Sequence, residues 1–355
     1  MSCILIKGGR IWNGNEFFNA DVLTQDQQII SIAENICQKA DFVYDAKGMI
    51  VSCGLVDIHA HMLGVSSHNF GIQAEMSCFP FGVTAACDAG AIHGNKQLLD
   101  TFSVKNKVFI GAQIKENRFN VDHCQAALER YDNRTAGIKI YFSAGKNNIW
   151  DVSPLQAVCD FAREKGIKVM VHCSGSPKPM EDIVCALSKG DILTHIYHGG
   201  NNNCTDNDFS ALRLAREKGI VLDAGFAGHV HTDLAIFQKA VSSGFLPDTI
   251  STDITCASAY KRGGRYGMTT CMSMARTAGM AEADIFRAVT ATPAKALEMS
   301  EQWGCLKEGG TADIAVISYE NEGFDLTDRA GNQLASDKGY RCKLCVSNGN
   351  VVYKD

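Results

Sequence analysis

Short apolar runs alternate with amphipathic stretches through the middle of the chain, and glycine stands at several of the joints. Residues 155–165 have helical periodicity after Ser153, a good N-cap, and Gly166 supplies a left-handed stop before the next apolar run. The sequence Ala-Arg-Glu-Lys-Gly-Ile occupies both 162–167 and 215–220. We therefore expect the same joint, from helix end to strand start, at two places in a βα repeat.

Eight of the apolar runs have the length and composition of buried strands. They alternate with helical stretches across about 250 residues, which is typical of a (β/α)8 barrel, an α/β fold with a parallel sheet. The expected strands are the run from Leu55, Gly82–Asp88, Lys107–Gln113, Ala136–Tyr141, Ile167–His172, Ile192–His195, Ile220–Ala224 and Thr249–Asp253.

The two ends of the chain have a different pattern, in which short strands are separated by turn residues. Residues 1–53 read as hairpins with a turn near Gly14, and residues 305–355 contain further strand pairs with a turn near Gly349. We expect these two segments to fold together as a small β-sandwich domain. Residues 54–304 would then form the barrel.

The first barrel strand leads into two histidines, His59 and His61, separated by one residue. Residues i and i+2 of a strand point to the same face, so both imidazoles leave the strand together. Two neutral imidazoles that converge in this way are a natural start to a Zn²⁺, Mn²⁺ or Fe²⁺ site. A single His-x-His pair is only moderately specific, so the other strand ends decide its meaning.

Four other expected strands carry a side chain that could hold metal, namely Lys139, His172, His195 and Asp253. Functional side chains of (β/α)8 barrels gather at the carboxyl ends of the strands. The separations between successive members of this set correspond to roughly one, one and two βα units. Six candidate ligands therefore fall at one end of one barrel.

Composition and charge are those of an ordinary globular protein, with 355 residues, 46% of them hydrophobic and 21% charged. The net charge of −5 and the lack of a dense basic run argue against a nucleic-acid partner. No apolar stretch reaches the ~18 residues that a membrane span requires. Fifteen cysteines in a large chain without an export signal indicate reduced thiols, and hence a cytoplasmic protein.

With these motifs the sequence resembles the amidohydrolase superfamily, and the resemblance covers the whole chain. The hallmarks are His-x-His after the first strand, lysine after the fourth, histidines after the fifth and sixth, and aspartate after the eighth. Residues 291–297 resemble the last barrel helix of that superfamily, and residues 304–314 resemble its return to the β-sandwich. The runs 137–139 and 193–195 are most similar to a deacetylase-type branch related to dihydroorotases, whose members hydrolyse acylated small acids.

The resemblance implies two divalent metal ions, most often Zn²⁺, with Mn²⁺ and Fe²⁺ as alternatives. The residues that would hold them are His59, His61 and Asp253 for the first ion, His172 and His195 for the second, and Lys139 between the two. A protonated lysine has no lone pair, so this lysine would have to react with CO₂ and form a bridging carbamate. The alternative is a lysine in an ordinary ion pair beside a single metal, as in the deaminase branch.

The implied reaction is hydrolysis of an amide or ester bond in an acylated small acid. A hydroxide between the metals would attack the substrate carbonyl, and Asp253 would serve as general acid and base for the leaving group. Some superfamily members have lost ligands and become non-catalytic assembly proteins. None of the six ligands is missing here, which favours an enzyme.

Substrate contacts are expected on the loops that follow the strands. Arg265 and Tyr266 follow the eighth strand, and Arg265 could clasp a substrate carboxylate through two hydrogen bonds. His198 follows the sixth strand and could line the pocket. His229 and His231 follow the seventh, where ordinary surface histidines are the more common case. We expect a small-molecule substrate, a carboxylate, and a homo-oligomer, the common state of soluble enzymes.

Dihydroorotase is the nearest alternative activity. It usually has an arginine two residues after the second histidine, to grip the carboxylate of the substrate, and this chain has Leu63 there. A hydantoinase or dipeptidase activity stays open, because the amide chemistry is the same and only the pocket differs.

Overall fold

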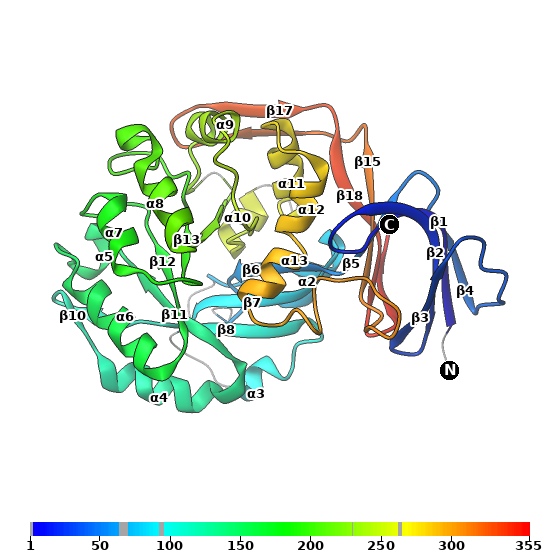
Figure 1. The fold of residues 1–355 in the computed structure, drawn as a ribbon, viewed down its shortest axis with the longest axis horizontal. Coiled ribbons are helices and arrows are strands. Elements are labelled where there is room, and N and C mark those ends of the chain that lie inside the picture. Colours follow the sequence, from blue (N-terminus) through cyan, green and yellow to red (C-terminus); the bar gives the residue numbers. More distant parts are fainter. Residues whose placement is uncertain (1–2, 64–69, 92–95, 229, 262–264) are drawn as a thin grey trace.

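A curved parallel sheet and a separate, mostly antiparallel sheet lie side by side in the computed structural model, which describes residues 3–63, 70–91, 96–228, 230–261 and 265–355 (Figure 1). The parallel sheet has seven strands in the order β14-β13-β12-β11-β8-β7-β6. Their bounds are β6 Leu55–Ala60, β7 Val83–Ala91, β8 Lys105–Gly111, β11 Thr135–Tyr141, β12 Lys168–His172, β13 Ile192–Thr194 and β14 Val221–Asp223.

Helices surround this sheet, and α4, α6 and α8 line its outer side in Figure 1. Strands covered by helices in this way are apolar on both faces, which explains the nearly continuous apolar runs in the sequence. The helices are α2 Ala74–Cys78, α3 Lys96–Leu99, α4 Val121–Tyr131, α5 Ala144–Asn147, α6 Ser153–Lys165, α7 Met180–Ala186, α8 Ser210–Lys218, α9 Leu234–Ser242, α10 Cys256–Lys261, α11 Met268–Thr277, α12 Glu282–Ala288 and α13 Ala291–Ala296. Short 3₁₀ turns are η1 Phe79–Phe81, η2 Asp132–Arg134 and η3 Asp206–Phe209.

Residues 249–254, which we call the barrel seam, connect β14 to β6 where the sequence predicts an eighth strand. The seam forms single parallel bridges to the ends of these two strands instead of a continuous ladder. The Asp253 N–H donates to the His59 carbonyl at 2.7 Å. Asp253 has a φ of +47°, which is outside the extended region and interrupts a regular strand. The predicted (β/α)8 barrel is present, with an irregular last strand.

The repeated helix-to-strand joint has the predicted glycine stops, because Gly166 and Gly219 are both left-handed, with φ of +67° and +71°. The start of α6 differs from the prediction by one position. Ser153 is the first residue of the helix and not its N-cap. The reason is Asp151, whose carboxylate accepts hydrogen bonds from the Ser153 N–H at 2.9 Å and from its hydroxyl at 2.6 Å.

Strands from both ends of the chain share the second sheet, in the order β19-β18-β15-β5-β1-β2-β3, with β4 also paired to β1. Both chain ends therefore lie in this part of the molecule (Figure 1). A separate apolar cluster, including Ile4, Val51 and Val346, packs against the sheet. The strands are β1 Cys3–Trp12, β2 Phe17–Gln25, β3 Gln28–Ala33, β4 Phe42–Asp45, β5 Ile50–Cys53, β15 Ile314–Glu320, β18 Gly339–Ser347 and β19 Asn350–Lys354.

One hairpin of the C-terminal segment leaves this sheet and crosses over the barrel helices. Strands β16 (Phe324–Thr327) and β17 (Gln333–Ser336) lie above α9 and α11 in Figure 1. In the turn between them, the Asp328 carboxylate accepts a hydrogen bond from the Leu234 N–H at 2.8 Å. That N–H belongs to the first turn of α9, so the hairpin caps a barrel helix. A further small hairpin is formed by β9 Ile114–Lys115 and β10 Arg118–Phe119.

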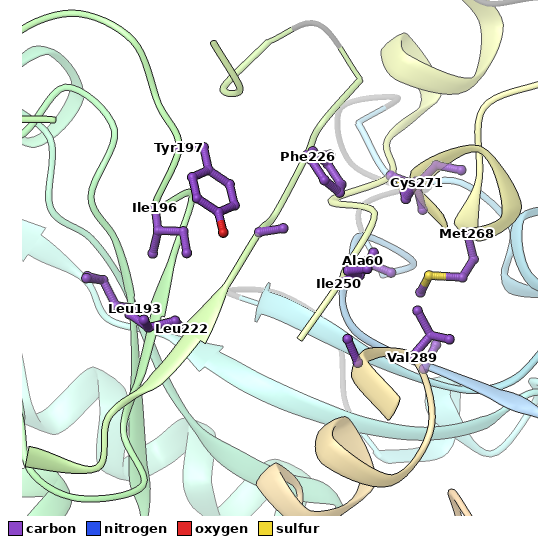
Figure 2. Close-up of a cluster of buried hydrophobic side chains, with 14 of the residues drawn as sticks. Ala60, Leu193, Ile196, Tyr197, Leu222, Phe226, Ile250, Met268, Cys271 and Val289 are labelled. Atoms are coloured by element: carbon purple, nitrogen blue, oxygen red, sulfur yellow. The ribbon is translucent and has the colours of Figure 1, made fainter. Parts of the chain in front are cut away.

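The apolar core continues around the closure of the barrel. Figure 2 shows side chains from β13, β14, the barrel seam and α11 in one cluster, among them Leu193, Leu222, Ile250 and Met268. This packing supports the seam where its hydrogen-bond ladder is incomplete. Within the described residues, no helix is long and apolar enough to cross a membrane.

Candidate metal centre

His59, His61 and Asp253 form a first group of possible metal ligands, which we call the seam group. The Asp253 Oδ1 atom lies 3.1 Å from His59 Nε2 and 2.8 Å from His61 Nε2. All three side chains are buried, and one potential ligand atom from each lies within 4.8 Å of the others. The barrel thus brings together three of the six residues that the sequence singled out.

A second group, which we call the rim group, contains His172 at the end of β12, His195 just after β13 and His231 in the loop after β14. The centroids of the three rings are 4.3 to 4.8 Å apart. The two groups adjoin, because Asp253 Oδ2 lies 3.9 Å from both His195 Nε2 and His231 Nε2.

His231 corrects the sequence-based interpretation, which favoured a surface histidine at this position. Its side chain is 22% exposed and lies against two predicted ligands. The cause is a fold-back of the loop, in which Thr232 forms an antiparallel bridge with His198. His229, the other histidine of this loop, lies outside the described residues.

The ring nitrogens of the predicted ligands are oriented by contacts behind them. His172 Nε2 lies 3.0 Å from the Ser174 carbonyl, and His195 Nδ1 lies 2.6 Å from the Gly225 carbonyl. A carbonyl only accepts, so these nitrogens carry the protons and the opposite nitrogens keep their lone pairs. His172 Nδ1 is buried without a hydrogen-bond partner. An orphaned imidazole lone pair beside other donors fits a bound metal ion.

Lys139 stands on β11 between the two groups. Its side chain is fully buried, and Nζ lies 3.1 Å from His59 Nε2. Burial lowers the pKa of Lys139 to about 8, against the opposing attraction of Asp253. Gly90 on β7 approaches the lysine stem, and a Cβ there would meet Lys139 Cγ at 3.4 Å. A neutral amine is therefore accessible at moderately alkaline pH.

Two of the candidate ligands have left-handed backbone conformations. The φ angles are +65° at His195 and +47° at Asp253. Such conformations cost non-glycine residues about 1–3 kcal/mol and cluster at functional sites. Each turns the chain sharply just beyond a strand end, so that the side chain points into the barrel mouth.

Thr194 and Asp223 form a network behind His59 that the sequence analysis did not single out. The Thr194 hydroxyl donates to Asp223 Oδ2 at 2.6 Å, and its oxygen lies 3.0 Å from His59 Nδ1. Thr249 and Ser251 of the seam donate to the same carboxylate at 2.7 Å. The position of Asp223 at the end of the predicted seventh strand was the available signal, because functional side chains of barrels occur at such ends.

Asp57 joins the first strand to the barrel seam and does not touch an imidazole nitrogen. Its carboxylate accepts hydrogen bonds from the Thr252 hydroxyl at 2.5 Å, from the Thr252 N–H at 3.2 Å and from the His59 N–H at 3.2 Å. Burial raises the pKa of Asp57 to about 7. Its contacts therefore connect barrel closure to the position of the adjacent Asp253.

The rim histidines are held in their neutral form. Burial lowers the pKa of His172 and of His195 well below the usual value, and lowers the pKa of His231 to about 4. Neutral imidazole is the form that binds metal, since the protonated ring has no lone pair to donate.

The seam group is charged. Burial acts to raise the pKa of Asp253, but His59 and His61 hold it well below its usual range, so the carboxylate is ionised. Burial and Lys139 lower the pKa of His59, but Asp253 and Asp223 outweigh them and raise it. An ionised carboxylate in a buried setting attracts positive charge, whether a proton on an imidazole or a metal cation.

The three predicted substrate contacts lie in different environments. His198 is buried, with Nδ1 2.9 Å from the Gly199 carbonyl and Nε2 without a hydrogen-bond partner. Arg265 is exposed, and among the described residues no carboxylate pairs with its guanidinium. Tyr266 is buried, and its hydroxyl donates to the Thr252 carbonyl at 2.7 Å. Tyr266 thus supports the barrel seam from behind, and its hydroxyl is engaged within the protein.

Comparison with known proteins agrees with this arrangement of strand-end ligands. The model of the amidohydrolase family matches residues 50–352. The chain belongs to the amidohydrolase family. This amidohydrolase is 26% identical over 369 residues to a deacetylase of Enterococcus faecalis, and the match covers 98% of each chain. The resemblance inferred from the motifs is thereby confirmed.

Solved structures confirm the fold of this amidohydrolase. A dihydroorotase aligns with a TM-score of 0.88 and 21% identity, covering 100% of this chain and 98% of the other. An adenine deaminase aligns with a TM-score of 0.84 and 22% identity, covering 100% of both chains. Members of the family generally bind divalent metals, and the seam and rim groups offer this amidohydrolase a candidate site. The chain is a hydrolase that acts on carbon–nitrogen bonds.

Proposed function

We propose that this amidohydrolase is a binuclear metal-dependent deacetylase that hydrolyses the amide or ester bond of an acylated small acid. The observation that carries the proposal is the meeting of the seam and rim groups at Asp253, with Lys139 between them. The full-length similarity to a protein named deacetylase supports the proposal that the substrate is an acylated small acid.

Two divalent cations, Zn²⁺ in the first instance with Mn²⁺ and Fe²⁺ as alternatives, would occupy the two groups. His59, His61 and Asp253 hold one, and His172 and His195 hold the other. The donor set fits, because the tautomers of three of these rings are fixed by hydrogen bonds behind them. When bound, such cations lower the pKa of water to about 7 and polarise a carbonyl oxygen.

Lys139, as a carbamate, would be a ligand of both cations. The buried amine with a pKa of about 8 supports this assignment, because CO₂ reacts with the neutral form. The modification would remove a positive charge that otherwise stands 3.1 Å from His59 Nε2. It would also supply oxygen atoms that can bind metal, which a protonated lysine lacks.

Asp253 transfers the proton. Its carboxylate is ionised, because His59 and His61 hold its pKa well below the usual range, and it can therefore accept the proton that the attacking water releases. It then delivers this proton to the leaving nitrogen or oxygen of the substrate, as general acid–base catalysis requires. Its left-handed backbone fixes the carboxylate between the His59 and His61 rings and the rim group.

Arg265 binds the substrate carboxylate, and His198 lines the pocket beside it. Arg265 is exposed and precedes Tyr266, whose hydroxyl reaches the residue before Asp253. A guanidinium on the loop that follows the barrel seam would suit the carboxylate of an acylated amino or hydroxy acid. Leu63, where dihydroorotases usually have an arginine, is buried, and its N–H donates to Asp88. A cyclic amide is therefore the less favoured substrate.

A reducing, cytoplasmic setting and a homo-oligomeric state complete the proposal. Among the described residues, which include all fifteen cysteines, no disulfide is present, which suits a compartment that keeps thiols reduced. Homo-oligomers are the common state of enzymes of this size.

The test is metal content per chain, followed by a substrate screen. Protein purified without chelator and with bicarbonate present is analysed for bound metals, and we expect close to two divalent ions. Acylated amino and hydroxy acids are then compared with dihydroorotate and hydantoins. Faster turnover of the cyclic amides would replace the deacetylase proposal, and a single bound ion would exclude the binuclear centre.

A further inference from the structure

The ring of His231 lies against the rings of the two other members of the rim group, His172 and His195. Its ring centroid is 4.3 Å from that of His195 and 4.8 Å from that of His172, and those two rings are 4.5 Å apart. The three rings form a closed triangle, and one nitrogen from each lies within 4.8 Å of the other two.

The backbone that directly follows His231 is held by hydrogen bonds. Thr232 pairs with His198, and its hydroxyl donates to the Phe226 carbonyl at 3.2 Å. The Asp233 N–H donates to the Tyr197 carbonyl at 2.9 Å. These bonds attach the loop after β14 to the loop after β13, so the ring position follows from the fold.

Within the described ranges of the chain, no hydrogen bond joins any two of these three rings, so hydrogen bonding does not explain why they lie together. His172 and His195 each donate their one ring proton to a carbonyl, so His172 Nδ1 and His195 Nε2 keep their lone pairs, and His172 Nδ1 is buried without a hydrogen-bond partner. Among the described residues, no group forms a hydrogen bond with either ring nitrogen of His231. The nearest carboxylate oxygen, Asp253 Oδ2, lies 3.9 Å from His231 Nε2. Imidazole lone pairs that converge without a donor repel one another, and a divalent cation at their centre removes this repulsion.

We propose that His231 is the third imidazole ligand of the second metal ion, together with His172 and His195. The inference rests on the proposed binuclear centre and extends its ligand set. Three imidazoles favour Zn²⁺ over Mg²⁺ or Mn²⁺, which prefer oxygen ligands. With the Lys139 carbamate they would give this ion four protein ligands, and a catalytic zinc site can expand to five-coordinate to accept water or substrate.

The experiment measures zinc binding by metal-stripped, bicarbonate-treated protein in competition with a chromophoric chelator. The wild type is compared with His231→Ala and His231→Asn, the second of which keeps a polar side chain of similar reach but is a poor ligand. His231→Cys restores a zinc ligand. His123→Ala, on the outer helix α4, controls for the loss of any histidine. Thermal unfolding of the stripped proteins checks that each variant is folded.

We expect the wild type and His123→Ala to bind two zinc ions. In His231→Ala and His231→Asn the weaker of the two sites should lose affinity by about 10-fold or more, since even groups behind a ligand are worth about 10–100-fold. His231→Cys should recover most of this loss. Cobalt-substituted protein should show the same change as an altered absorption spectrum of one ion only.

Two zinc ions bound with unchanged affinity in both His231→Ala and His231→Asn would overturn the assignment of His231 alone and make it a pocket residue. Fewer than two ions bound to the wild type would overturn the binuclear centre as well. The two failures are therefore distinguished by the wild-type measurement. An unfolded His231→Ala protein leaves His231→Asn and His231→Cys to decide between these outcomes.

Discussion

The seam group, His59, His61 and Asp253, lies where the barrel closes, whereas the rim group, His172, His195 and His231, lies at or beyond the ends of three successive strands. The seam group contains the carboxylate and is supported by side chains, through the Thr194–Asp223 pair behind His59. The rim group consists of imidazoles only, and backbone carbonyls orient two of them.

The two halves of the centre should therefore differ in which substitutions disturb their metal ligands. Substitution of a side chain behind the seam group removes a hydrogen bond that orients a ligand. Among the described residues, backbone carbonyls and not side chains accept the ring protons of His172 and His195, so changes in loop backbone or in the ligands themselves should disturb the rim group most. The following predictions test this contrast, from the largest effect to the smallest.

Asp253→Asn removes the proton-transfer group and weakens the seam group. We expect kcat/KM for the best acylated acid to fall by about 10²–10⁴-fold, the usual contribution of a general acid–base group. Steady-state kinetics at saturating metal measures the effect. Activity close to that of the wild type would mean that proton transfer belongs elsewhere in the molecule.

Lys139→Ala removes the residue that joins the two groups. We expect the metal content to fall well below that of the wild type and turnover to drop by more than about 100-fold, since groups behind a ligand already contribute about 10–100-fold. Elemental analysis and kinetics measure both effects. Short carboxylic acids, added as substitutes for the carbamate, should restore part of each. Unchanged metal content would argue against the bridge.

Thr194→Val removes the hydrogen bond behind His59 while keeping the shape of the side chain. We expect metal affinity or kcat/KM to fall by about 10–100-fold. Thr249→Val is the matched control, because its hydroxyl donates to the other oxygen of Asp223 and contacts no histidine. Equal losses of zinc affinity in the two variants would show that Asp223 acts through barrel stability and not through orientation of His59.

Tyr266→Phe removes one of the two hydrogen bonds that the Thr252 carbonyl of the seam accepts, and the Ala227 N–H at 2.9 Å keeps the other. We expect the free energy of unfolding to fall by about 1 kcal/mol, the net contribution of one buried hydrogen bond, with only a small change in KM. Tyr260→Phe is the control, because that tyrosine is 64% exposed and should change stability by less than about 0.5 kcal/mol. Denaturant unfolding measures both. A large rise in KM for Tyr266→Phe alone would return Tyr266 to the substrate pocket.

The barrel and the clustering of six candidate ligands could be predicted because both depend on local pattern. Apolar runs of strand length alternate with helices, and functional residues of such barrels stand at strand ends. A correct assignment of the strands was therefore enough to predict that Lys139, His172 and Asp253 lie close together. The domain boundaries at 53/54 and 304/305 stay predictions, as do the metal-binding roles themselves.

The features that sequence analysis did not predict depend on contacts between distant segments. His231 joins the rim group only because its loop pairs with the loop that carries His198. Tyr266 looked like a substrate contact, yet its ring is buried and its hydroxyl reaches the barrel seam. The N-cap of α6 was misplaced because the Asp151 carboxylate accepts hydrogen bonds from both the N–H and the hydroxyl of Ser153, which lies inside the helix. The hydrophobic and polar pattern within one segment cannot show which other segment it contacts in the folded protein.

The barrel seam also limits how this scaffold could be re-engineered. Its backbone closes the sheet, its Thr252 side chain contacts Asp57, and its Asp253 is the proposed proton carrier. Libraries limited to the loop that follows His198 leave the seam and the proposed ligands unchanged. Libraries that vary residues 249–254 change barrel closure and the proposed proton carrier together. Most of their members should therefore fail to fold or to catalyse the reaction, whatever their substrate specificity.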